Sequence, residues 1–235
     1  MSFRKIVLVI VEGPSEDEAL SVILEKIYSN NTVRILIMHR DITSEKGVSS
    51  DNIISKISKT VSTYAISTHF KKSDFQEIIH IVDTDGAYIP NSHIIEDKNL
   101  KKTIYSPTYI KTNNKIGIEA RNKQKSSNIN KIWNCKKVWG INYHLFYMSC
   151  NLDHVLYNKL NSTNKEKWED SFDFAKKYKE NIPRFISFIS GSDFSVTSSY
   201  EESWDFIKKD LHSLERHTNL GVCFSEDSSL LKTTK

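Results

Sequence analysis

The stretch KIVLVIVEGPSEDEAL, residues 5–20, decides the fold class of this chain. After Lys5 it continues as an unbroken aliphatic run, which is typical of a strand buried on both faces, as in a parallel sheet. Glu12-Gly13-Pro14 interrupts the run. The sequence SEDE at residues 15–18 has the pattern of a capping box, which predicts that a helix begins there.

The same alternation continues downstream. VRILIM at 33–38 and EIIHIV at 77–82 predict two further strands, and apolar spacing predicts helices over 20–27 and 51–70. This β-α-β-α-β order favours a parallel sheet with helical crossovers. WGINYHLFYM at 139–148 predicts a fourth strand, and further helices are expected over 118–133, 152–160, 165–178, 182–189 and 201–217.

These elements predict an α/β fold in two parts. We expect a parallel sheet flanked by helices over residues 1–150, with a basic insertion at about 90–137, and a helical extension over 151–235 packed on it. A polar tail is expected after Glu226. The chain has 235 residues and 38% hydrophobic residues, which is enough for a substantial core.

Composition excludes several classes of protein. No run of about 18 apolar residues is present, so we expect no membrane span. The three cysteines, Cys135, Cys150 and Cys223, lack CxxC spacing, which argues against a disulfide framework or a zinc ribbon. Unpaired thiols fit a reducing compartment, and we expect a cytoplasmic protein.

Charge is distributed unevenly along the chain. The formal net charge is +4, but residues 98–137 alone carry an excess of ten positive charges, with Glu119 the one acid. Tyr105, Tyr109 and Trp133 lie among these basic residues, a combination that suits phosphate neutralisation and base stacking. The segment predicts a nucleic-acid-binding element, and the alternative is a solvated surface loop. Its basic residues are Lys98, Lys101, Lys102, Lys111, Lys115, Arg121, Lys123, Lys125, Lys131, Lys136 and Lys137.

Acidic residues follow two of the predicted strands. Glu12 ends the first, and Asp83 and Asp85 end the third. The carboxyl ends of parallel strands meet at one edge of a sheet, where ligands bind. Carboxylates gathered there need a neutralising partner, and a hard divalent cation such as Mg²⁺ or Mn²⁺ is the simplest one. Asp41 also ends a strand, and we expect it to cap a loop.

The two motifs VLVIVEGPSEDEAL and IIHIVDTDG resemble the Toprim domain. Topoisomerases, bacterial primases, small RNA-maturation nucleases and OLD-type (overcoming lysogenization defect) nucleases share this domain. The resemblance covers about residues 4–90, completed by the fourth strand near 139–150, and EGPSE is most similar to the OLD-type branch. It implies a Toprim-like Rossmannoid sheet with Glu12, Glu16, Asp83 and Asp85 in metal binding and catalysis.

The OLD-type branch also uses an acid and a lysine after the last strand. Asp153 would be that acid and a metal ligand, and Lys165 or Lys167 would be the catalytic lysine. The chain departs from that branch because no GxxxxGK[ST] motif occurs in it, so any ATPase partner would be a separate protein.

The resemblance implies an Mg²⁺-dependent endonuclease acting on DNA or RNA, with a role in bacterial antiviral defence. A homodimer is one open assembly state. The alternatives are a non-catalytic Toprim-like subunit that binds nucleic acid or an ATPase, and nucleotidyl transfer as in primases. A structural reading is also open, in which Glu12 caps a helix and DTDG is a turn. A haloacid-dehalogenase phosphatase is disfavoured, since its DxDG follows the first strand.

Overall fold

The computed structural model describes residues 5–28 and 33–224, with the backbone but not the side chains of residues 15–17. Its central sheet has the strand order β2-β1-β3-β8-β7. Strands β1 (Lys5–Val11), β2 (Val33–His39), β3 (Phe75–Asp83) and β8 (Ile141–Met148) are parallel, and the short edge strand β7 (Lys137–Val138) is antiparallel to β8. The predicted α/β class with a mostly parallel sheet is confirmed.

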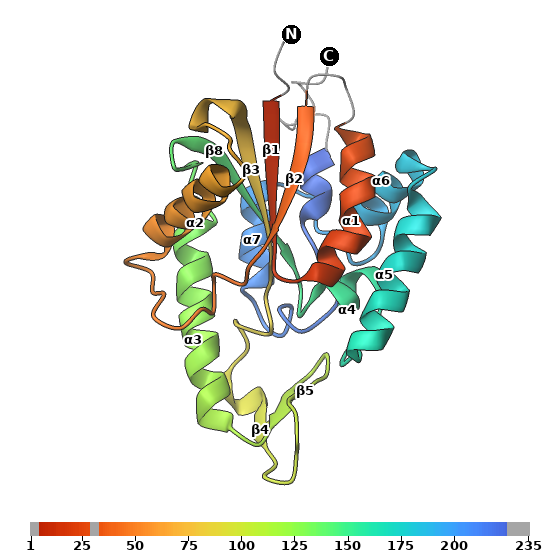
Figure 1. Cartoon of the computed structure of the whole chain (residues 1–235). Helices are drawn as coiled ribbons and strands as arrows, with labels where there is room; N and C mark the ends of the chain where they lie inside the picture. The colour runs from red at the N-terminus through yellow and green to blue at the C-terminus, as the bar shows by residue number, and fades with distance from the viewer. Residues whose placement is uncertain (1–4, 29–32, 225–235) are drawn as a thin grey trace.

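Helices cover both faces of this sheet (Figure 1). Helices α1 (Pro14–Ile27), α5 (Asn164–Tyr178) and α6 (Ile182–Gly191) share one core with the sheet. Helices α2 (Ile53–Ser67), α3 (Lys115–Ile132) and α7 (Tyr200–Ile207) contribute to the core on the other face. The expected tail after Glu226 falls outside the described residues.

The side chains of β1 show why the sheet has a hydrophobic core on each of its two faces. Val7, Val9 and Val11 belong to the core under α1, whereas Ile6 and the other even-numbered residues belong to the core under α2. These side chains are at most 1% exposed. Since successive side chains of a strand point to opposite faces, an unbroken aliphatic run supplies two cores at once, at about 1.5–3 kcal/mol per buried side chain.

Helix α1 begins earlier than the sequence predicts. Gly13 is its N-cap and Pro14 its first residue, so the capping box, which would make Ser15 the N-cap, places the start two residues too late. Proline suits the first helical position because its fixed φ matches the helix and its missing N–H has no partner there anyway.

The insertion holds a small sheet that the sequence does not predict. Strands β4 (Ile94–Glu96), β6 (Ile110–Thr112) and β5 (Ile104–Tyr105) form it, next to a 3-10 turn at Asn91–His93. Ile89, Ile94 and Ile110 pack there with Cys150 and Leu214 in a third apolar cluster. In Figure 1 this sheet projects beyond the carboxyl edge of the central sheet.

The C-terminal region departs from prediction in one helix. Helix α4 (Leu152–Tyr157) is present, but α7 ends at Ile207 and the predicted helix over 201–217 is wrong beyond that residue. Residues 208–217 form turns instead, and the carbonyl of Ser213 in this segment accepts a hydrogen bond from the N–H of Gly86 in the loop after β3. Two further 3-10 turns are Lys72–Asp74 and Leu220–Phe224.

No helix in the described ranges 5–28 and 33–224 is both long and apolar enough to cross a membrane.

Candidate active site at the carboxyl edge of the sheet

The ends of β1 and β3 meet as the sequence predicts. The two strands pair in parallel, with Ile10 opposite His80. Glu12 leaves the end of β1, and its Oε1 accepts a hydrogen bond of 3.1 Å from the backbone N–H of Asp83. The structure therefore brings the Glu12 carboxylate to the start of the Asp83-Thr84-Asp85-Gly86 turn.

This turn has a backbone that few residues adopt. Asp85 has φ +50° and Gly86 has φ +70°, both in the left-handed region. A Cβ on Gly86 would lie 2.7 Å from Cδ2 of Leu214, so a side chain here would have to displace Leu214 and adopt a strained positive φ. Aspartate adopts positive φ more readily than most residues other than glycine, so the sequence at these two positions suits the turn.

Neighbouring segments hold the turn in place. The Asp85 N–H donates to the carbonyl of Cys150 at 2.8 Å, just after β8. The carbonyl of Ser213 accepts from the Thr84 hydroxyl at 2.7 Å and from the N–H of Gly86 at 3.1 Å. The C-terminal region thus fixes the loop that carries the two aspartates.

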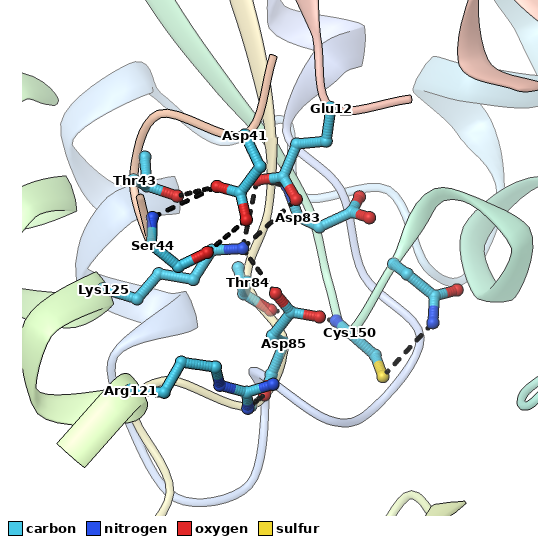
Figure 2. A network of polar contacts seen from close by, with 12 residues as sticks. Glu12, Asp41, Thr43, Ser44, Asp83, Thr84, Asp85, Arg121, Lys125 and Cys150 are labelled. Carbon is cyan, nitrogen blue, oxygen red and sulfur yellow. Dashed lines mark hydrogen bonds and ion pairs between the residues drawn. The ribbon is translucent and has the colours of Figure 1, made fainter. Parts of the chain in front are cut away.

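Lys125 from α3 joins the acidic residues. Its side chain is 0% exposed, and Nζ lies 3.0 Å from Oε1 and 3.3 Å from Oε2 of Glu12. The same nitrogen donates to Oδ2 of Asp85. Figure 2 shows the amino group among these carboxylates, with Asp41 and Asp83 close by. One buried cation therefore links the ends of β1 and β3.

Burial and charge shift the pKa values of this pair in predictable directions. Burial raises the pKa of Glu12 to about 8, against the opposite effect of the Lys125 ammonium. Burial alone would lower the pKa of Lys125, but the carboxylates of Asp85, Glu12, Asp41 and Asp83 raise it well above its usual value. A fixed ammonium and a high carboxyl pKa both reduce the negative charge that this edge carries.

Helix α3 approaches the site with a buried polar face. Asn122 donates to the carbonyl of Gly86 at 3.1 Å, and Asn128 donates to the carbonyl of Thr43 at 2.8 Å. Arg121 donates to the carbonyl of Asp85 at 2.7 Å. These hydrogen bonds satisfy backbone carbonyls in the loops after β2 and β3. They attach α3 to both loops and so fix the position of Lys125.

Asp41 caps its loop, as expected, and also faces the site. Its Oδ1 accepts from the Thr43 hydroxyl and from the Ser44 N–H, each at 3.1 Å. Burial alone would raise the pKa of Asp41. The Lys125 ammonium and the hydrogen bonds from Ser44 and Thr43 outweigh burial and lower the pKa below its usual value. Asp41 therefore remains ionised and adds to the negative field around Lys125.

The remaining predicted site residues lie elsewhere or are not described. Asp153 in α4 pairs with Lys167 of α5, with 2.9 Å between Oδ2 and Nζ. Lys165 is 84% exposed and pairs with Glu169 one turn along its own helix. Glu16 lies in the first turn of α1, and its side chain falls outside the described residues. Their predicted roles stay predictions.

The basic insertion uses several of its charges internally. Lys98 pairs with Glu96, and Lys111 pairs with Asp97 at 2.9 Å. Of its three interleaved rings, Tyr105 bonds Arg121, and Trp133 packs against the ring of Trp204. Tyr109 is an exposed ring. The surface charge excess is therefore smaller than the sequence count, and Tyr109 is the ring most accessible to a ligand.

The donor chemistry of the edge fits a hard divalent cation, although a lysine holds the oxygens of Glu12 and Asp85. Glu12, Asp83 and Asp85 offer carboxylate oxygens, which Mg²⁺ and Mn²⁺ prefer. Within the part of the chain that the structure describes, no three His, Cys, Asp or Glu side chains are arranged to hold a metal ion. Lys125 takes the oxygens of Glu12 and Asp85 instead.

Sequence reasoning missed Lys125 and Arg121 as site residues. It counted both as surface charge, whereas their helix turns them toward the carboxyl edge. Asn122, Lys125 and Asn128 are spaced three residues apart, which places them on one side of the helix, but in a polar helix this spacing alone does not distinguish a buried lysine from a solvated one.

A scan of protein-family models, a search of curated proteins and a search of solved structures each gave no match. The site is therefore described from its own residues.

Proposed function

We propose that the carboxyl edge of the sheet hydrolyses phosphodiester bonds of DNA or RNA with Mg²⁺ or Mn²⁺, in a Toprim-type domain of the OLD-like branch. The observation that carries the proposal is the meeting of Glu12 with the Asp83–Asp85 turn at the ends of two adjacent parallel strands. A basic insertion that begins directly after this turn supports a polyanionic substrate.

Each group has a defined task in this proposal. Glu12, Asp83 and Asp85 would hold the metal, which supplies stabilisation of negative charge on phosphate oxygens. The exposed Lys101 and Lys102 of the insertion would contact the substrate backbone.

A cleavage assay tests the proposal. The full chain is incubated with mixed RNA and DNA, with and without Mg²⁺ or Mn²⁺, beside Glu12→Gln and Asp83→Asn. Metal-dependent cleavage is expected, and both variants should lose about 100-fold or more in rate because each removes a charged oxygen donor. Asp170→Asn is the matched control, since Asp170 lies in α5 and pairs there with Lys159, which has no role in the proposed site. Full activity in Glu12→Gln would reject the assignment.

A second function is a non-catalytic subunit that binds nucleic acid or an ATPase partner. One observation favours it: a lysine already neutralises the carboxylates that a metal would need. In this case the chain would retain labelled RNA or DNA in a salt-dependent manner and would cut neither with any metal. Binding without cleavage in all metal conditions would replace the first proposal with this one.

A further inference from the structure

The ammonium of Lys125 fills the space where the proposed metal needs ligands. A lysine ammonium has three N–H donors, and here its contacts are both oxygens of Glu12 and Oδ2 of Asp85. These are the charged oxygens that the ends of β1 and β3 bring together. The lysine therefore holds, as a built-in monovalent cation, the oxygens that a divalent cation would require.

Simultaneous occupation by both cations is unfavourable. A Mg²⁺ ion bound to these oxygens would lie about 2.1 Å from each of them. Nζ lies 3.0 Å from Oε1 of Glu12, so the ion and the ammonium would be close neighbours. Lys125 is 0% exposed, so little water is available to screen the repulsion between them.

Helix α3 keeps the lysine in this position. Arg121 and Asn122, the residues four and three positions before Lys125, bond the carbonyls of Asp85 and Gly86. The helix begins at Lys115, directly after the small sheet of the insertion, with Asn114 as its N-cap. A movement of the insertion would therefore be transmitted to the lysine through one continuous helix.

We propose that Lys125 and a divalent cation compete for the same carboxylate oxygens, so that Lys125 leaves the edge when metal binds. The inference rests on the proposed metal-dependent function and names the residue that controls metal loading. It also assigns Lys125 to the site rather than to the substrate-binding surface, since the side chain is fully buried.

Metal binding to a neutral variant tests the competition. Lys125→Met keeps the length of the side chain and removes its charge. Mn²⁺ binding is measured by the electron paramagnetic resonance signal of free Mn²⁺ for wild type, Lys125→Met and Lys123→Met. Lys123 is an exposed lysine on the same helix and serves as the matched control. Lys125→Met should bind Mn²⁺ between about 5-fold and 150-fold more tightly than wild type, and Lys123→Met should match wild type.

Thermal unfolding provides a second test that also applies if Lys125→Met folds poorly. Because the variant leaves two carboxylates without their cation, Mn²⁺ should raise the unfolding temperature of Lys125→Met more than that of wild type. Equal or weaker Mn²⁺ binding by the variant, with no extra stabilisation, would overturn the competition and leave Lys125 as a structural residue.

The wild-type chain provides an independent test. In protein with ¹³C-labelled lysine, the Lys125 Cε signal should move toward that of exposed lysines as Mg²⁺ is added. A signal that stays unchanged while Mg²⁺ binds would contradict the proposal. Tighter Mn²⁺ binding by Lys125→Met without cleavage by any form would reject the nuclease function alone. Cleavage with unchanged Mn²⁺ affinity would reject this inference alone.

Discussion

Two carboxylate–lysine pairs of this protein differ in which partner is enclosed. At the carboxyl edge the lysine is enclosed: Lys125 is 0% exposed, while Glu12 and Asp85 are 12% and 22% exposed. Between α4 and α5 the acid is enclosed: Asp153 is 3% exposed and Lys167 is 34% exposed. An enclosed cation shared by two strand ends organises an anionic edge, whereas an enclosed acid with one half-exposed lysine ties two helices together.

The Asp153–Lys167 pair also satisfies fewer of the hydrogen-bonding groups of its acid. Oδ1 of Asp153 is buried and receives no hydrogen bond from the described residues. In the first pair, both oxygens of Glu12 are engaged by Lys125, and Oε1 also accepts from the N–H of Asp83. Only the first arrangement gathers several acids around one cation, the Lys125 ammonium.

Removal of the buried Lys125 ammonium should have the largest effect on stability. Lys125→Met should lower the free energy of unfolding by about 3–5 kcal/mol in metal-free buffer, because it leaves two crowded carboxylates without their partner. Urea denaturation followed by circular dichroism measures this change. A loss of less than about 1 kcal/mol would show that the edge does not depend on its lysine.

Glu77 extends the comparison to a buried acid with no lysine partner among the described residues. It lies near the other end of β3, is 4% exposed, and burial raises its pKa to about 7. A carboxyl with a raised folded pKa favours the folded state fully below its unfolded pKa of about 4.5, and this contribution is lost as pH rises through about 7.

Glu77→Gln should therefore remove a pH dependence of stability. Glu77 should lower the wild-type free energy of unfolding by up to about 3 kcal/mol as the pH rises from 4.5 to 8. The Glu77→Gln variant should not show this contribution. Urea midpoints across this range measure it. Parallel pH profiles for variant and wild type would mean that Glu77 is not a buried acid of high pKa.

The half-exposed pair should give the smallest effect. Lys167→Met should cost about 1–2 kcal/mol, less than Lys125→Met, because water can partly solvate the acid that remains. A double-mutant cycle with Asp153→Asn isolates the coupling of the pair. A cost for Lys167→Met equal to that for Lys125→Met would remove the distinction between the two regions.

The strand ends were predictable from sequence because they follow from local rules. An aliphatic run that ends in Glu12 and another that ends in Asp83 specify buried parallel strands, and parallel strands end at one edge. The small insertion sheet was not predictable, since its strands have two or three residues and show no alternating pattern.

Lys125 was not predictable for a different reason. A lysine in a polar helix is normally solvated, and its burial here depends on two carboxylates that lie 113 and 40 residues away in sequence. Likewise, the turns that follow α7 contact the loop after β3, as the Ser213 carbonyl does when it accepts from the Thr84 hydroxyl. Long-range polar contacts decide both features, and local sequence patterns do not contain them.

The most direct measurement is a crystal structure of the full chain with Mn²⁺, using anomalous scattering to locate the ion. The account predicts an anomalous peak coordinated by carboxylates of Glu12, Asp83 and Asp85, with the Lys125 ammonium displaced from Glu12. Lys125 still bound to Glu12 and Asp85 at saturating Mn²⁺, with no peak at this edge, would contradict the account.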